Sequence, residues 1–384
     1  MKLLPIHAAE LTRELDASDF NQRAELYVAD AGGAARCLAC AHGCVIAPGG
    51  RGACGVRTNR DGELFAPFGY VARRYVRAVE TNTVFHVAPG AQALTFGMYG
   101  CDLRCPYCHN HQLSQALRDG STEEHPTAMD ADALVGEALA AGCSVLCAAY
   151  NEPLVSAEWT RAVFERARRR GLLTVLVSDG HSTSEALTYM RPVTDVFRVD
   201  LKAHSEDAYK RLGGRLAPVL RSIALARDLG YWVEVVTLVV PGLNQEASAV
   251  ASIGDALRAI DPAIPWHLNA FVPKYRLRQV PPADPLFLML AAGAAYAAGS
   301  RFVYVGNTRA CAELAHTHCP ECHTVVIRRL DYATLENRLK AGHCPACGYE
   351  LPGLWTGPHA QSAALAAPSR SRPLASTGKA AQGG

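Results

Sequence analysis

The chain has 384 residues, of which 49% are hydrophobic, 19% charged and 7% aromatic. This composition is typical of soluble globular proteins and excludes disordered and collagen-like chains. The formal net charge of +2 argues against nucleic acid or an anionic membrane as the main partner. No apolar run approaches the roughly 18 residues of a membrane helix, and the apolar start at residues 3–6 is too short for a signal peptide. We therefore expect a cytoplasmic protein without a membrane partner.

The chain contains 14 cysteines. In the reducing cytoplasm they cannot form a disulfide framework, so we expect most of them to be metal ligands. Their spacing supports this, because all but Cys143, Cys147 and Cys311 fall into three compact groups. Cys143 and Cys147 lie around an apolar run and are predicted to pack as small hydrophobic side chains.

The first group belongs to a predicted N-terminal module, residues 1–75. Its ligand candidates are Cys37, Cys40, Cys44 and Cys54. Glycines between the last two cysteines allow tight turns around a metal. Four thiolates suit a closed site, which is either structural zinc or a second iron–sulfur cluster. We favour the cluster slightly because another cluster is predicted nearby, and His42 is a candidate to replace one ligand.

From residue 93 onward, short apolar runs alternate with helical stretches. The runs are rich in Val and Leu with little polar alternation, as parallel strands covered on both faces should be. The predicted strands are residues 93–97, 144–150, 172–178, 196–202, 232–240, 265–271 and 301–305. The predicted helices between them include residues 131–141, 156–170, 216–229 and 247–260. This order predicts right-handed crossovers and a parallel sheet.

Six or seven strand–helix units are fewer than the eight of a closed barrel. We therefore expect an α/β fold in which residues 76–312 form a partial (β/α)6 TIM-like barrel with one following strand. An open doubly wound sheet is the alternative. Both place the ligand at the carboxyl ends of the strands. Polar side chains gather at those ends, namely Asn151, Glu152, Ser178, Asp179, Asp200, Lys202 and Asn269.

The second cysteine group lies in the segment 100–110, directly after the first predicted strand. Cys101, Cys105 and Cys108 have the spacing C-x3-C-x2-C. Three thiolates on one tight loop can hold three irons of a 4Fe-4S cluster and leave the fourth iron without a nearby cysteine. Such an iron is open to a substrate or cofactor. The alternative is a tetrahedral zinc site that borrows a distant ligand.

The third group marks a predicted zinc-ribbon-like module, residues 313–355. It consists of two C-P-x-C knuckles with a strand-like stretch between them, and its ligand candidates are Cys319, Cys322, Cys344 and Cys347. Two such knuckles at this separation indicate zinc. Residues 356–384 are rich in Ala, Ser, Pro and Gly, and we expect a disordered tail.

The three-cysteine loop, with the aromatic Tyr107 directly before its last cysteine, resembles the signature of the radical S-adenosylmethionine (SAM) superfamily. The resemblance runs from Cys37 to Trp355. It is closer to one branch, the radical SAM enzyme of the AmmeMemoRadiSam system, which is similar to pyruvate formate-lyase activating enzymes. The stretches that carry it are residues 37–44, 150–153, 199–202, 237–244, 265–267 and 304–307.

The resemblance implies an enzyme in which Cys101, Cys105 and Cys108 are catalytic. The amino and carboxylate groups of SAM would chelate the open iron of a 4Fe-4S cluster. One electron would break the bond to the 5′ carbon, and the 5′-deoxyadenosyl radical would abstract hydrogen from an unidentified protein or small-molecule substrate. The resemblance further implies an electron donor such as flavodoxin or ferredoxin, and Memo-like and AMMECR-like partner proteins.

The cofactor-binding residues implied by the resemblance are Tyr107, Glu152, Ser178, Asp200, Lys202 and His267. Glu152 matches the acid that accepts hydrogen bonds from the SAM amino group. Ser178, Asp200 and Lys202 match ribose and carboxylate contacts. The alternatives are a strand-end ion pair for Asp200 and Lys202, and a hydrogen-bonded core histidine for His267.

The sequence departs from the family pattern on the presumed substrate side. His109 stands in place of glutamine, Asp179 in place of asparagine, and residues 81–83 in place of Lys-Lys-Pro, while residues 268–273 lack the usual Ser-Arg and His. These changes concern the substrate and leave the radical chemistry intact. The competing function is a metal-cluster or electron-transfer protein without SAM chemistry, which would leave the polar strand ends unexplained.

Overall fold

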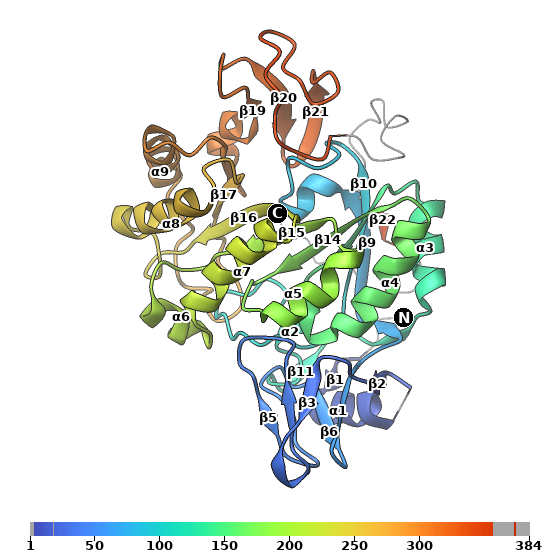
Figure 1. The fold of residues 1–384 in the computed structure, drawn as a ribbon. Helices are drawn as coiled ribbons and strands as arrows, with labels where there is room; N and C mark the ends of the chain where they lie inside the picture. The colour runs from blue at the N-terminus through green and yellow to red at the C-terminus, as the bar shows by residue number, and fades with distance from the viewer. Residues whose placement is uncertain (1–3, 18, 356–371, 374–384) are drawn as a thin grey trace.

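The computed structural model describes residues 4–17, 19–355 and 372–373, and Figure 1 shows their arrangement around one large sheet. The strands of this sheet are β9 (Arg73–Ala78), β10 (Gln92–Gly97), β13 (Val145–Ala148), β14 (Leu173–Ser178), β15 (Val196–Asp200), β16 (Trp232–Val239), β17 (Trp266–Ala270), β18 (Val303–Gly306) and β22 (Arg372–Pro373). Their spatial order is β18-β17-β16-β15-β14-β13-β10-β9-β22. All seven predicted strands are therefore present and follow one another across the sheet.

From β10 through β13, β14, β15, β16 and β17 to β18, each strand pairs in parallel with the next. Strand β9 is antiparallel to β10. The strands β18 and β22 form the two edges, so the sheet is open within the described part of the chain. The fold is thus a mixed α/β fold with a mostly parallel sheet. The parallel strands are apolar because both of their faces are covered.

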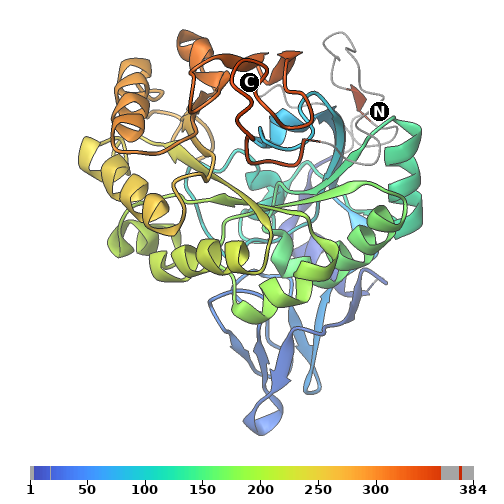
Figure 2. The same ribbon diagram turned by 45° about the horizontal axis from the view of Figure 1, so that its top comes forward.

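Helices cover the outer side of the sheet, which Figure 2 shows as curved. They are α3 (Ala131–Ala140), α4 (Ala157–Arg169), α5 (Ser184–Met190), α6 (Glu206–Leu212), α7 (Leu216–Asp228), α8 (Ala247–Ile260) and α9 (Pro285–Ala297). Several begin at side-chain caps, as the Asp130 carboxylate accepts hydrogen bonds from the first turn of α3 and Thr183 caps α5. None of the helices in the described ranges is long and apolar enough to span a bilayer.

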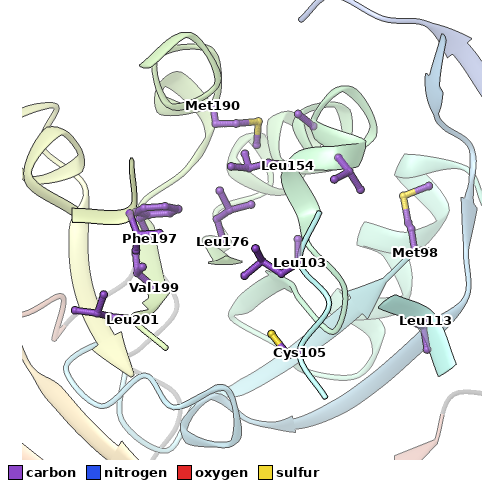
Figure 3. Close-up of a cluster of buried hydrophobic side chains, with 14 of the residues drawn as sticks. Met98, Leu103, Cys105, Leu113, Leu154, Leu176, Met190, Phe197, Val199 and Leu201 are labelled. Carbon is purple, nitrogen blue, oxygen red and sulfur yellow. The ribbon is translucent and has the colours of Figure 1, made fainter. Parts of the chain in front are cut away.

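The main core lies between the sheet and these helices. Figure 3 shows that Leu103 and Cys105, from the cysteine-rich segment after β10, belong to this core together with Leu176 of β14 and Phe197 of β15. A second apolar cluster fills the inner side of the sheet. There the segment 79–91 packs on Ala93, Val145, Cys147, Val175 and Val196. Cys143 and Cys147 are buried in these clusters, as predicted.

The N-terminal region projects below the sheet in Figure 1. Its elements are β1 (Ile6–His7), α1 (Ala8–Ala17), β2 (Asn21–Arg23), β3 (Tyr27–Ala29), β4 (Ala35–Cys37), β5 (Val45–Ile46), β6 (Thr58–Arg60), β7 (Glu63–Pro67) and β8 (Tyr70–Val71). They form two small sheets, β2-β7-β6 and β3-β4-β5. The short elements α2 (His111–Ser114), β11 (Ser121–Thr122) and β12 (Thr127–Ala128) follow β10, and β11 and β12 pair with β1 and β8.

The C-terminal cysteine-rich region forms a three-stranded sheet at the opposite end of the molecule in Figure 1. Its strands are β19 (Thr317–His318), β20 (Val325–Leu330) and β21 (Ala333–Asn337). The buried Arg329 of β20 joins this small sheet to the segment 79–91, called the inner segment below. The Arg329 guanidinium donates to the Phe85 carbonyl over 2.7 Å and lies over the Phe85 ring. The predicted tail at 356–384 lies outside the described residues, apart from β22.

Candidate functional site

A cleft of about 760 Å³ opens at the carboxyl ends of the parallel strands, on the sheet face opposite the helices. Its size is typical of a pocket for a small ligand. Eight of the sequence-predicted site residues line it, namely Cys101, Cys105, Tyr107, Cys108, Glu152, Ser178, Asp200 and Lys202. The converging strand ends therefore bring together side chains that are up to 101 residues apart in the sequence.

The three-cysteine loop is held by specific contacts. Gly100 has φ +93°, and a Cβ there would lie 2.7 Å from Val56, so only glycine fits. The Arg118 guanidinium donates to the Cys101 carbonyl over 2.7 Å and to the Leu103 carbonyl over 3.0 Å. These bonds fix the backbone of the loop at the cleft before any ligand binds.

The three thiols need a positive partner to ionise. Burial raises the pKa of all three, that of Cys105 to about 12, although the nearby Lys202 ammonium lowers the pKa of Cys105. Metal coordination requires thiolates, so an iron centre would supply the missing charge. Within the described chain, the three sulfurs do not form a donor set whose members all lie within 4.8 Å of one another.

The Glu152 carboxylate is held in the cleft near Cys101. Both of its oxygens accept hydrogen bonds from the Ser178 hydroxyl over 3.0 Å, and Oε2 also accepts from the Asp179 amide over 2.8 Å. Burial, together with the charge of Asp102, raises the pKa of Glu152 to about 7. The pKa of Asp179 is raised by the same two causes. Crowded buried acids favour a ligand that is cationic or donates hydrogen bonds.

Asp200 and Lys202 form the ion pair that the sequence left as an alternative, and both also face the cleft. The Lys202 ammonium lies 2.9 Å from Asp200 Oδ2, and Arg198 pairs with the other carboxylate oxygen. Burial raises the pKa of Asp200, but the charges of Arg198 and Lys202 outweigh this effect and hold it below its usual value. Asp200 is therefore an anion at the rim of the cleft.

His267 lies behind the cleft and not among its lining residues. It is 1% exposed, its Nε2 lies 2.8 Å from Glu234 Oε2, and its ring stacks on Tyr304 at 5.0 Å. Burial lowers its pKa, although the bond to Glu234 raises it. This is the arrangement of a hydrogen-bonded core histidine, the alternative that the sequence left open.

Sequence reasoning missed several residues that line the cleft, among them Arg77, Arg198 and Tyr332. One signal for Arg198 was present, because it is the only charged residue before Asp200 in the otherwise apolar strand β15. Tyr332 enters from the turn between β20 and β21, where its hydroxyl donates to the Asn307 side chain. No local pattern places this distant turn at the cleft.

The N-terminal cysteine group packs against the three-cysteine loop. Cys37, Cys40 and Cys54 are buried and Cys44 is half-buried. The Ala53 amide donates to Cys44 Sγ over 3.4 Å. In the described residues no three of these sulfurs lie within 4.8 Å of one another. His42 does not lie with these sulfurs. Its ring nitrogen lies within 4.8 Å of ligand-type atoms of Asp102 and His181, and its Nε2 is 3.9 Å from Asp102 Oδ2.

The C-terminal cysteine group has the spacing of a single-ion site. All four sulfurs lie within 4.8 Å of one another, with Cys319 and Cys347 3.5 Å apart and Cys322 and Cys344 3.6 Å apart. Four thiolates at the usual Zn–S distance around a tetrahedral ion would be about 3.8 Å apart. The four cysteines can therefore hold one metal ion.

Comparison with known proteins agrees with this geometry. Residues 96–251 match the sequence profile of the radical SAM superfamily. An uncharacterised protein of Methanocaldococcus jannaschii is 31% identical over 320 residues, which cover 82% of this chain and 94% of that protein. A pyruvate formate-lyase-activating enzyme of Streptococcus mutans is 24% identical over 181 residues, which cover 45% of this chain and 68% of that protein.

Solved structures with related folds include a radical SAM methyltransferase from Sphaerobacter thermophilus, with a TM-score of 0.45, 14% identity and coverage of 58% of this chain and 67% of that one. A domain of a pyruvate-formate lyase-activating enzyme from Bacteroides vulgatus has a TM-score of 0.37 and 13% identity, covering 42% of this chain and 98% of that one. The profile match assigns residues 96–251 to the radical SAM superfamily, and the similarity to activating enzymes identifies the protein as an enzyme.

Proposed function

We propose that the protein cleaves SAM reductively and abstracts a hydrogen atom from an unidentified protein or small-molecule substrate. Cys101, Cys105 and Cys108 would hold a 4Fe-4S cluster. When bound, this cluster supplies the electron that converts SAM into methionine and the 5′-deoxyadenosyl radical. One observation carries the proposal: the three cysteines share a cleft with the buried acid Glu152 and the ion pair of Asp200 and Lys202.

The residues of the cleft have distinct tasks in this proposal. The Glu152 carboxylate, with Ser178 and the Asp179 amide holding its oxygens, accepts hydrogen bonds from the SAM amino group. Asp200 accepts from the ribose hydroxyls, and Lys202 pairs with the SAM carboxylate. Tyr107 is buried beside Cys105 and shields the cysteine loop from water. This distribution matches the two charges of a zwitterionic ligand.

We further propose that the chain belongs to the AmmeMemoRadiSam branch, on the strength of the resemblance from Cys37 to Trp355. The open, curved sheet with helices on its outer side supports a partial (β/α)6 TIM-like barrel over residues 76–312. Flavodoxin or ferredoxin would deliver electrons in the cytoplasm, and Memo-like and AMMECR-like proteins would be partners. The C-terminal cysteines would hold zinc, and the N-terminal ones a second iron–sulfur cluster.

Anaerobic reconstitution with iron and sulfide, followed by dithionite and SAM, tests the proposal. The wild-type protein is expected to form 5′-deoxyadenosine, quantified by liquid chromatography. Cys105→Ala should abolish its formation, whereas Cys143→Ala, which removes a buried thiol outside the cleft, should retain it. Equal yields from Cys105→Ala and wild type would refute the proposal and favour a metal-cluster protein without SAM chemistry.

A further inference from the structure

We infer that the deep part of the cleft binds the anionic group of a small-molecule substrate, a carboxylate or a phosphoryl group, through Arg77 and Arg198. The inference rests on the proposed function, because it assigns a substrate class to the same cleft. Both arginines line this cleft on the inner side of the sheet. They come from strands β9 and β15, which β10, β13 and β14 separate in the sheet.

Strand register places the backbone of both arginines below the ends of the strands. Arg77 pairs with Ala93 near the start of β10, whereas the cysteine loop follows the end of that strand at Gly97. Arg198 precedes Asp200 by two residues on β15, which is roughly 7 Å along a strand. Both arginines therefore enter the cleft from positions below the strand ends that carry the cofactor residues.

Arg77 has no counter-ion among the residues that the structure describes. Three arginines lie on β9, and two of them are paired, Arg73 with Glu124 and Arg74 with Glu137. Arg77 is half-buried and has no hydrogen bond or ion pair to any described residue, and its guanidinium lies over the Tyr75 ring at 5.0 Å. Its buried Nε has no acceptor. An unpaired guanidinium in a cleft wall is costly unless a ligand supplies the acceptor.

Arg198 is only partly satisfied. Its side chain is 10% exposed, and one terminal nitrogen pairs with Asp200. Its Nε is buried and has no acceptor among the residues that the structure describes. Asp200 is also shared with Lys202, so one carboxylate serves two cations. The Nε–H of Arg198 is therefore free to donate a hydrogen bond to an anionic ligand.

The charges of the cleft are separated along its length. At the cysteine end, Glu152 and Asp179 are acids that suit the cationic groups of SAM. At the mouth, Arg309 is paired with Asp331. Among the described residues, the part of the cleft lined by Arg77 and Arg198 carries excess positive charge, because Arg77 has no ion pair there and the Asp200 carboxylate is shared by two cations. Planar guanidiniums recognise carboxylate and phosphoryl oxygens with two parallel hydrogen bonds. An anionic substrate group therefore complements this part of the cleft.

Calorimetric titration of the cluster-loaded protein with inorganic phosphate and with malonate, each against chloride at equal ionic strength, tests the inference. We expect saturable binding of at least one anion. Arg77→Gln should weaken it about tenfold, the effect of losing one charge-assisted contact. Arg328→Gln removes the same charge from the exposed side of β20 and should leave binding unchanged. Binding of phosphate alone would support a phosphoryl substrate, and binding of malonate alone a carboxylate.

Three outcomes would overturn the inference: no binding of either anion, equal binding by Arg77→Gln, or displacement of the anion by saturating SAM, which would assign the site to the cofactor carboxylate. If Arg77→Gln does not fold, Arg77→Lys keeps the charge, loses the planar fork and should still weaken binding. Formation of 5′-deoxyadenosine by the same wild-type preparation reports on the proposed function separately. Anion binding by a preparation that forms no 5′-deoxyadenosine would refute the proposed SAM cleavage but would still support the anion site.

Discussion

At the scale of single residues, the chemistry depends on charges that the fold holds away from water. Glu152 is 2% exposed, and its neighbours Ser178 and Asp179 aim it at the cleft. Burial and the Asp102 charge both oppose its ionisation. Hydrogen bonds from a bound amino group would stabilise the carboxylate, so binding and ionisation at this position favour each other.

Glu152→Gln should therefore bind SAM at least tenfold more weakly than wild type, because the neutral amide keeps the shape but is a weaker acceptor for the SAM amino group than the carboxylate. Equilibrium dialysis of the cluster-loaded protein with labelled SAM measures the affinity. Glu123→Gln, at an exposed position, is the matched control and should bind as wild type does. An unchanged affinity in Glu152→Gln would remove this residue from the cofactor site.

His86 makes stability depend on pH. It is fully buried, its Nε2 lies 2.6 Å from the Tyr304 hydroxyl, and its Nδ1 lies 2.8 Å from the Pro352 carbonyl. Burial lowers its pKa to about 4, although the charge of Glu234 raises it. The unfolded chain binds this proton near pH 6.5. The contribution of neutral His86 to the free energy of unfolding is therefore fully present above pH 6.5, and it is lost as the pH falls towards 4.

From these two pKa values, His86 accounts for about 2 kcal/mol of the fall in the free energy of unfolding between pH 7 and pH 5. In His86→Gln this fall should be smaller by that amount. Urea unfolding at both pH values, followed by circular dichroism, measures the difference. Equal falls in both proteins would show that His86 does not titrate in this range.

At the scale of elements, the cysteine loop joins the sheet to the N-terminal region. Arg118, which follows α2, donates to carbonyls of Cys101 and Leu103 and also to the Ala53 carbonyl beside Cys54. A single side chain therefore holds the loop and the N-terminal cysteine region together. Gly100 allows the close approach of Val56 at the same junction.

Arg118→Met should loosen the loop, because it removes these three hydrogen bonds and retains an extended side chain. We expect the reconstituted iron–sulfur absorbance to decay roughly tenfold faster in air than in wild type. Arg104→Met, on the exposed side of the same loop, should decay at the wild-type rate. Equal decay in both variants would show that Arg118 does not protect the cluster.

The sequence predicted elements better than it predicted their contacts. Strands such as β13 and β16 follow from uninterrupted apolar runs, and the acids and amides at their ends could be placed at one rim. Arg77 and Tyr332 could not be placed there, because β9 is antiparallel and the β20–β21 turn is distant in the sequence. The side chain of His267 points away from the cleft and contacts Glu234. This orientation depends on the register of β17 against β16, which only the assembled sheet defines.

At the scale of the whole molecule, the two outer cysteine-rich regions flank the cleft from two sides. The C-terminal cysteine sheet reaches it through Tyr332, whose hydroxyl also accepts from the Asn307 amide over 3.0 Å. Arg329 fastens the same sheet to the inner segment. The metal of this region would thus stabilise part of the cleft wall without taking part in the reaction.

Cys347→Ser should therefore release zinc and leave the iron content unchanged, since Cys347 lies in a different region from the cleft cysteines. Mass spectrometry of the metals in purified, reconstituted protein measures both. Cys311→Ser is the matched control, because this thiol belongs to none of the cysteine groups. Retained zinc in Cys347→Ser, or loss of iron with the zinc, would contradict separate sites.

The central claim is that one iron of the cluster has no protein ligand and is open to SAM. Electron paramagnetic resonance of the dithionite-reduced protein, recorded with and without SAM labelled with ¹⁷O in its carboxylate, tests it most directly. We expect SAM to change the spectrum of the reduced cluster, and we expect the ¹⁷O label to broaden that spectrum. Identical spectra with and without SAM, from a cluster that is fully formed, would contradict it.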